Sequence, residues 1–270
     1  MGSDMEELSL IEIQNELHAM LVEIDDICRR EGLRYSLYAG TMLGAIRHNG
    51  FIPWDDDADI AMPREDYERF LKLDIKKIVP RRELLNGRNS PLPFPFTKYV
   101  NKTIRVETPT FKGITKEYLW VDVFPIDVSF DTLNEMKKHV MWRKYMQKLA
   151  YTTSAKTENI PKQALKNIVA LTIGRRWPAK RCVSLIEEKA QSLSDCNTEH
   201  VAMMAWGGYG ESEWFDKTMF ENYVETDFMG SSLMVVEDWN TCLTQIYHDY
   251  LILPPENERF THKIRAWKCS

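Results

Sequence analysis

The sequence contains no long hydrophobic run, and no uncharged apolar stretch approaches the roughly 20 residues of a membrane-spanning helix. Glycine and proline are scarce, at 12 each in 270 residues, which excludes collagen-like and low-complexity chains. Residues 1–12 are acidic and polar, so no signal peptide is expected there. With 44% hydrophobic and 28% charged residues, the chain can bury a core of one large domain, or of one domain with an insertion.

Cysteine is also sparse and is never spaced as a CxxC pair. The five cysteines are Cys28, Cys182, Cys196, Cys242 and Cys269. An odd number of scattered cysteines gives no disulfide framework and no zinc-binding pattern. We therefore expect a protein of a reducing compartment, the cytoplasm.

The net charge of −5 is unevenly distributed along the chain. Residues 136–182 contain twelve Lys or Arg and a single acid, Glu158. A basic block in an acidic protein favours a specific anionic partner over general nucleic-acid binding. Within it, residues 164–181 join an apolar stretch to a cationic end with Trp177, which indicates either peripheral contact with the inner face of the cell membrane or a buried helix followed by a solvated turn.

Hydrophobic periodicity predicts an α+β fold, a small sheet near the front followed by a helical insertion. Gly32 is expected to end a helix over residues 5–31. Further helices are predicted at 42–48, 63–73, 132–189 (with interruptions) and 236–247, strands at 33–38, 57–62, 96–106, 118–128 and 220–225, and a loop at 81–95. The chain is divided into a catalytic core (1–130), a basic helical insertion (131–200) and a C-terminal segment that packs on the core and completes the site (201–270).

Four acids occur within five positions: Asp55, Asp56, Asp57 and Asp59. On a strand, Asp57 and Asp59 point to the same face, since side chains alternate. Two adjacent carboxylates repel unless a cation lies between them, and hard oxygen ligands suit Mg²⁺ or Mn²⁺. An isolated Asp-x-Asp is most often a solvated loop, but Asp122 lies on a separate predicted strand and can complete a three-carboxylate cluster.

Several other polar residues are candidates for phosphate contacts. Gly40 and Thr41 open a helix after a strand, where free backbone N–H groups can receive a phosphate. Arg47 and His48 either contact pyrophosphate oxygens or pair structurally with the acids. Lys98 is either a phosphate ligand or an ordinary lysine on a strand. The Gly- and aromatic-rich segment 202–210 is either a platform for an acceptor sugar or a tight turn with packed aromatic residues.

The segment Gly40-Thr-Met-Leu-Gly-Ala-Ile-Arg-His-Asn-Gly-Phe-Ile-Pro-Trp-Asp-Asp-Asp-Ala-Asp59 resembles the signature of the LicD family, which includes the fukutin-related transferases. Trp120-Val-Asp-Val-Phe-Pro-Ile-Asp127 and the tail Tyr247-His-Asp-Tyr-Leu-Ile-Leu-Pro-Pro255, with Arg259 and His262, extend the resemblance. It covers about residues 33–128 and 215–265. In the tail, His248 replaces the glycine that is usual in the family.

This resemblance implies a nucleotidyltransferase-like fold, a small mixed sheet flanked by helices. It also implies transfer of phosphocholine, or a similar phospho-alcohol, from a CDP-linked donor to a cell-surface glycan precursor, free or lipid-linked. Asp57, Asp59 and Asp122 are then the metal ligands and catalytic residues, and Gly40 and Thr41 the phosphate turn.

Two other functions stay open at this point. One is a nucleotidyltransferase that attacks the α-phosphate of an NTP. The other is a non-catalytic nucleotide- or glycan-binding module that has kept the fold.

Overall fold

The first helix, α1 (Leu10–Glu31), is specified by a capping residue at each end. Ser9 and Glu12 form a capping box at the N-terminus. At the other end, Gly32 adopts the left-handed conformation (φ 61°) in which glycine carries no steric penalty. The predicted end of this helix at Gly32 is thus confirmed, whereas the helix begins at Leu10, five residues after the predicted start.

The computed structural model describes residues 6–90, 92–107, 117–154, 172, 176–259 and 261–269. In these ranges, the other helices are α2 (Ala39–His48), α3 (Arg64–Leu71), α4 (Ile75–Ile78), α5 (Leu133–Ser154), α7 (Ala179–Gln191) and α8 (Trp239–Tyr247). The strands are β1 (Ser36–Leu37), β2 (Asp59–Pro63), β3 (Arg82–Asn86), β4 (Thr97–Glu107), β5 (Glu117–Val128), β6 (His200–Ala202), β7 (Trp214–Asp216), β8 (Tyr223–Phe228), β9 (Ser231–Val236) and β10 (Arg265–Lys268). No helix among these ranges is long and apolar enough to cross a membrane.

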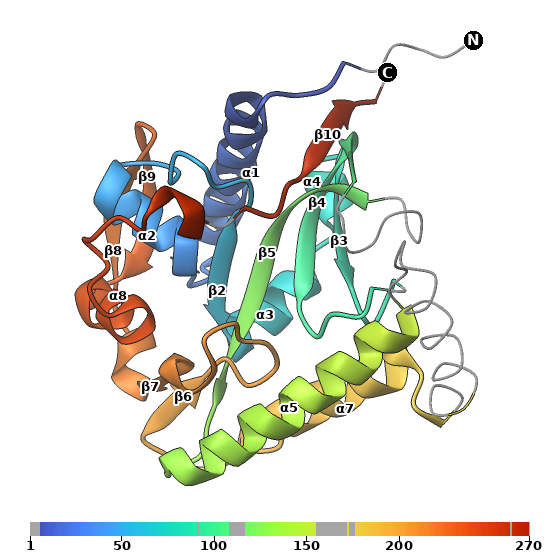
Figure 1. Cartoon of the computed structure of the whole chain (residues 1–270), viewed down its shortest axis with the longest axis vertical. Coiled ribbons are helices and arrows are strands. Elements are labelled where there is room, and N and C mark those ends of the chain that lie inside the picture. Colours follow the sequence, from blue (N-terminus) through green and yellow to red (C-terminus); the bar gives the residue numbers. More distant parts are fainter. Residues whose placement is uncertain are drawn as a thin grey trace.

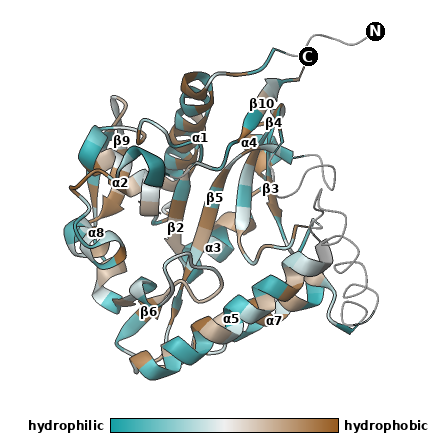
Figure 2. Cartoon of the chain, viewed as in Figure 1, coloured by the Kyte–Doolittle hydropathy of each residue, from teal (hydrophilic) through white to brown (hydrophobic). Residues whose placement is uncertain are grey.

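A mixed sheet forms the centre of the molecule, in the strand order β1-β2-β5-β4-β10 (Figure 1). The pair β2–β5 is parallel, whereas β4 is antiparallel to β5 and to β10. β3 pairs with β4, and β6 and β7 continue from the far end of β5. The central strands β2 and β5 are largely hydrophobic (Figure 2) because they are buried on both faces. The α+β fold expected from the sequence is confirmed.

Helices α5 and α7 lie side by side across one end of the sheet, opposite the end where the two chain termini meet (Figure 1). They share a separate apolar cluster that includes Met136, Met146 and Ile186. The segment 164–181, predicted to contact a membrane or to form a buried helix, lies outside the described residues except for 172 and 176–181. The domain boundaries at 130 and 200 stay predictions.

Four strands of the main sheet were not predicted: β3, β10 and the short strands β6 and β7. β3 lies in the expected loop 81–95, where polar Arg82 and Asn86 are buried with Leu84 and obscure the usual alternation of apolar and polar residues. Buried Arg82 is held by Glu23 of α1, through Nε–Oε2 at 2.6 Å. β10 lies in the proline-broken tail and owes its position to pairing with β4. In addition, β8 and β9 form a hairpin where only the first strand was expected.

Candidate active site

The register of three neighbouring strands aligns a lysine and two carboxylates. Asp122 on β5 lies opposite Lys98 on β4 and opposite Asp59 on β2. Lys98 Nζ lies 2.9 Å from Asp122 Oδ1, and Trp120 Nε1 donates to Asp122 Oδ2 at 3.1 Å. The predicted proximity of Asp59 and Asp122 is therefore present, and both oxygens of Asp122 already accept a hydrogen bond.

The loop before β2 carries the other three acids of the run. Asp56 is buried and accepts hydrogen bonds from the backbone N–H groups of His262 and Ile264, both at 2.8 Å. His262 Nδ1 lies 3.2 Å from Asp57 Oδ2. Asp56 thus holds the C-terminal segment in place, and this segment sets His262 beside Asp57.

The carboxylates raise one another's pKa. Burial, followed by repulsion from Asp57 and Asp122, raises the pKa of Asp59 well above its ordinary value. Burial and the charge of Asp57 likewise raise the pKa of Asp55 to about 8. Burial raises the pKa of Asp122, although the adjacent ammonium of Lys98 opposes this. The cations of the site are therefore too few to keep all of these carboxyl groups ionised together.

His262 responds to the same charge in the opposite direction. Burial lowers its pKa, but the hydrogen bond to Asp56 and the charges of Asp57 and Asp55 outweigh burial and raise the pKa to about 9. The imidazole is therefore cationic at neutral pH. His262 occurs in the tail that resembles the LicD family, but the sequence alone gave it no role.

These carboxylates suit a hard divalent cation chemically, but they do not form a closed metal cage. No three His, Cys, Asp or Glu side chains in the described ranges are close enough together to hold a metal ion by themselves. Mg²⁺ often takes only one or two protein carboxylates and completes its shell with water and substrate phosphates. The oxygen donors and the uncompensated charge fit such an ion at Asp57 and Asp59.

The start of α2 lies against the acid loop. Ala39, with φ 46°, turns the chain from β1 into α2. A methyl group on Gly40 would lie 3.1 Å from Asp55 Oδ2, and the buried hydroxyl of Thr41 accepts a hydrogen bond from the N–H of Asp59 at 2.8 Å. Gly40 and Thr41 are thus adjacent to the carboxylates, and their role as a phosphate turn stays a prediction.

Arg47 and His48 lie at the opposite end of the same helix, in its last turn. Arg47 Nη1 donates to the backbone carbonyl of Tyr250 at 2.7 Å. No ion pair found in the described part of the chain joins Arg47 to the acid run. Burial lowers the pKa of both side chains. Arg47 connects α2 to the C-terminal segment, and contact of either residue with pyrophosphate stays a prediction.

Aromatic rings surround the ammonium of Lys98. Its Nζ lies 3.8 Å from the ring centroid of Trp120, 5.2 Å from that of Phe94 and 5.6 Å from that of Phe96. Trp206 packs against both phenylalanines, with centroids 5.7 and 5.0 Å away. Cation–π attraction and the ion pair together fix this lysine beside Asp122. The sequence predicted Lys98 as a candidate but not the aromatic rings around it. Among these rings, only Trp120 belongs to a segment that resembles the LicD family.

Two tyrosines complete the neighbourhood of the acids. The hydroxyls of Tyr209 and Tyr247 are 2.6 Å apart. Burial first, and then the charges of Asp59 and Asp57 among others, raise the pKa of Tyr209 to about 12. Segment 202–210 therefore brings a phenol to the site.

The chain is similar in sequence to proteins of one described family. Residues 32–177 match the family profile described as LicD/FKTN/FKRP, nucleotidyltransferase domain. The chain is 27% identical over 268 residues to the lipopolysaccharide cholinephosphotransferase LicD of Haemophilus influenzae, covering 97% of this chain and 98% of that protein. An uncharacterised protein of Rickettsia prowazekii is 35% identical over 78 residues, 29% of this chain and 25% of that protein. The profile spans the strands and the loop that bring Lys98, Asp59 and Asp122 together, and the chain belongs to the LicD family.

Proposed function

We propose that this enzyme transfers phosphocholine, or a similar phospho-alcohol, from a CDP-linked donor to a hydroxyl of a cell-surface glycan precursor. The observation that carries the proposal is the row Lys98–Asp122–Asp59 with Asp57 beside it, in a chain similar over 97% of its length to a lipopolysaccharide cholinephosphotransferase. A non-catalytic binding module does not need buried carboxylates that repel one another, so this reading is set aside.

In the proposed reaction Asp57 and Asp59 hold Mg²⁺ or Mn²⁺, and Asp122 is the third ligand that the family resemblance implies. The ion, when bound, stabilises negative charge on the phosphoryl oxygens. Attack falls on the phosphorus that bears the alcohol, and CMP leaves in line with the acceptor oxygen. The N–H groups at the start of α2, at Gly40 and Thr41, bind a donor phosphate.

Asp122 accepts the proton of the acceptor hydroxyl. Burial raises its pKa and so increases its proton affinity, while Lys98 and Trp120 fix the orientation of its two oxygens. Lys98 also supplies positive charge next to the developing phosphoryl charge. Arg47 and His48 contribute, in this proposal, to pyrophosphate binding from the far end of α2.

The test measures which product leaves the donor. Purified protein is incubated with CDP-choline and a glycan acceptor, and in parallel with CTP, with Mg²⁺ or with EDTA. We expect Mg²⁺-dependent release of CMP from CDP-choline, reduced by roughly a hundredfold or more in Asp59→Asn. Asp195→Asn, which removes an exposed carboxylate from outside the site, should leave the rate unchanged.

Other products decide between the remaining functions. Pyrophosphate from CTP, without CMP from CDP-choline, would replace the proposal with nucleotidyl transfer to an acceptor. Repeating the assay with CDP-ribitol and CDP-glycerol identifies the alcohol. The lipid-linked acceptor, the cytoplasmic location and membrane contact through 164–181 are separate proposals that this assay does not address.

A further inference from the structure

The outer side of α5 combines exposed apolar and basic residues. At about 100° per residue, its exposed positions other than Glu135 fall on an arc of roughly 140°, and its buried positions face the opposite way. Leu133, Met141 and Tyr145 on this arc are 40%, 66% and 64% exposed. Between them lie the exposed lysines Lys137, Lys138, Lys144 and Lys148, with no acid on the arc. We call these seven residues the α5 outer face.

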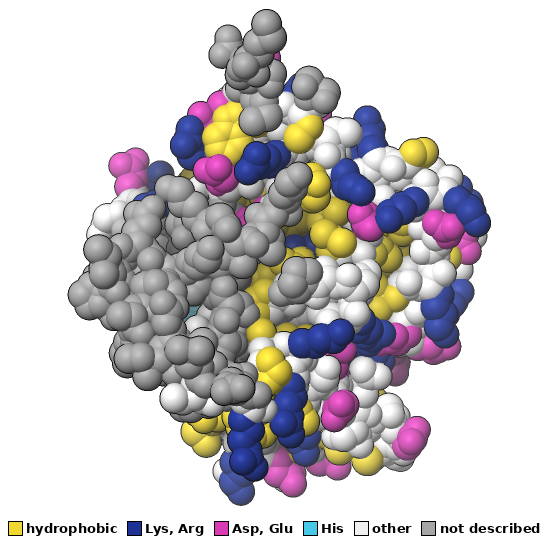
Figure 3. All heavy atoms as spheres, turned by 90° about the vertical axis from the view of Figure 1, so that its right-hand side faces the viewer, with side chains coloured by type: hydrophobic (Ala, Val, Ile, Leu, Met, Phe, Trp, Pro, Cys, Tyr) yellow, Lys and Arg dark blue, Asp and Glu magenta, His cyan; other side chains and the backbone are white. Residues whose placement is uncertain are grey.

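The positive charge continues onto the neighbouring helix. α7 adds exposed Lys180, Arg181 and Lys189, and the exposed acids of the two helices are Glu135 and Glu188. Seven basic side chains therefore accompany two acids in a protein whose net charge is −5. Figure 3 shows Lys and Arg side chains next to apolar ones, with Asp and Glu side chains among them, along the lower edge of the molecule, the end to which α5 and α7 belong in Figure 1.

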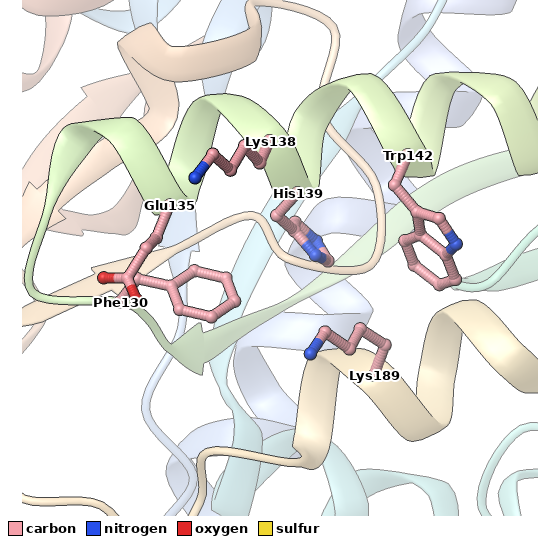
Figure 4. A pocket seen from close by; sticks show the side chains of 6 residues that line it. All are labelled: Phe130, Glu135, Lys138, His139, Trp142 and Lys189. Carbon is pink, nitrogen blue, oxygen red and sulfur yellow. The ribbon is translucent and has the colours of Figure 1, made fainter.

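A cavity of about 240 Å³ opens between the two helices. The rings of Phe130 and Trp142 form part of its wall, and Lys138 of α5 and Lys189 of α7 contribute their side chains from either side (Figure 4). Lys189 Nζ lies 5.6 Å from the ring centroid of Phe130. Glu135 and His139 also line the cavity. Its two ammonium groups outnumber its one carboxylate, and this positive charge beside aromatic rings suits an anionic head group that carries an apolar body.

The inner side of the same helix supports the active site. Arg143 donates to the backbone carbonyls of Met203 and Gly207, and His139 Nε2 donates to that of Met204 at 2.8 Å. These contacts hold the segment that carries Trp206, whose ring packs beside Phe94 and Phe96 around Lys98. A partner on the outer face would therefore have a fixed orientation relative to the carboxylates.

We propose that the α5 outer face, with the adjoining cavity between α5 and α7, docks the enzyme onto an anionic lipid surface. Met141 and Tyr145 enter the head-group region, and the lysines contact lipid phosphates. Charge complementarity selects this partner. Exposed methionine and tyrosine lie among lysines, with no acid on the α5 outer face, which matches an anionic interface that also accepts apolar side chains. An acidic protein groove would match the lysines alone. This inference does not depend on which group the enzyme transfers.

Vesicle co-sedimentation tests the proposal with the full chain. The vesicles contain phosphatidylcholine alone or with about 30 mol% phosphatidylglycerol, a composition that gives a negative surface potential. We expect the protein to partition onto the anionic vesicles only, and roughly tenfold less when Lys137, Lys144 and Lys148 are all changed to Gln. Met141→Ser with Tyr145→Ser should reduce the partitioning that persists at high salt, since salt screens the lysines and leaves the apolar contribution.

A charge-matched control separates this face from general electrostatics. Lys72→Gln with Lys76→Gln and Lys77→Gln removes the same charge from exposed positions around α4 and should leave partitioning within about twofold of the unmodified protein. Circular dichroism establishes that each variant is folded.

Three outcomes overturn the proposal. The unmodified protein stays in the supernatant with every vesicle, or it binds neutral vesicles as well as anionic ones, or both triple variants lose binding to the same degree. Self-association in sedimentation velocity that the α5 variant abolishes would assign the face to a second copy instead.

Discussion

Lys98 is a cation that acts on two carboxylates of the site, Asp122 and Asp59. Its ammonium lies 2.9 Å from Asp122, and it also lowers the pKa of Asp59, which burial and three other carboxylates raise. The rings of Trp120, Phe94 and Phe96 exclude water around it, so the charge is weakly screened. A single neutral substitution should therefore change how the whole carboxylate row titrates.

Lys98→Met retains the length and apolar stem of the side chain but removes its charge. The pKa of Asp122 should then rise further, because burial is no longer opposed by the ammonium. We expect kcat/KM to fall roughly ten- to a hundredfold and its acid limb to move to higher pH. Steady-state rates from pH 5 to 10 check this, with Lys98→Arg as the charge-retaining control. An unchanged acid limb in Lys98→Met would show that Lys98 does not act on Asp122.

Glu213 links protein stability to pH through a second buried charge. Burial raises its pKa from 4.5 to about 7, although Arg143 and hydrogen bonds from Tyr209 N–H and the Tyr38 hydroxyl oppose this. Between these two values the folded protein keeps a proton that the unfolded chain has released. Raising the pH through this window therefore favours unfolding.

Glu213→Gln removes this linkage and keeps one acceptor oxygen. We expect the two proteins to have similar free energies of unfolding near pH 4.5. By about pH 7.5 the unmodified protein should have lost stability relative to the variant, on the order of 1–3 kcal/mol. Urea denaturation at several pH values measures the difference. Parallel stability curves would contradict the assignment.

At the scale of elements, α5 holds the 203–207 backbone so closely that one glycine is required. A methyl group on Gly207 would overlap with Glu213 Oε2 and lie 3.0 Å from both Nη atoms of Arg143. Gly207→Ala should therefore destabilise the fold by about 1–3 kcal/mol, the usual cost of overpacking a tight interior. Gly208→Ala is the control, since a methyl group there meets no atom within 4 Å. Equal midpoints in urea for the two variants would show that the 203–207 backbone moves freely.

The sequence predicted the elements that have a regular local pattern of apolar and polar residues, and it missed those that depend on partners far away in the chain. β4 and β5 were expected at nearly their observed bounds, and Asp122 is flanked by apolar residues on β5. The pairing of Lys98 with Asp122 follows from the register of these two strands. β3 was missed because Arg82 is buried only by virtue of Glu23, 59 positions away. The place of His262 depends on Asp56, 206 positions earlier. Local periodicity contains no information about such pairs.

At the scale of the whole molecule, the end of the chain is part of the site architecture. β10 adds to the edge of the sheet beside β4, and Leu8 N–H donates to the carbonyl of Ala266 at 2.8 Å. Asp56 accepts the two backbone N–H groups at 262 and 264 that precede β10. Sheet closure and the acid loop are therefore stabilised by the same segment.

Asp56→Ala should consequently affect both stability and activity, although Asp56 is expected to touch neither donor nor metal. It removes the acceptor of two backbone N–H groups, one of them buried, a loss of about 2–4 kcal/mol. It also frees His262, so the positive charge beside Asp57 is no longer held in place.

Arg265→Gln is the matched control on the same segment. It breaks an exposed pair with Glu7 and a cation–π contact with Trp267, each worth less than about 1 kcal/mol. Thermal unfolding and CMP release measured on both variants decide the point. If Asp56→Ala lost stability but kept the full rate on the folded fraction, the tail would only close the sheet; a loss of both would make the tail a working part of the site.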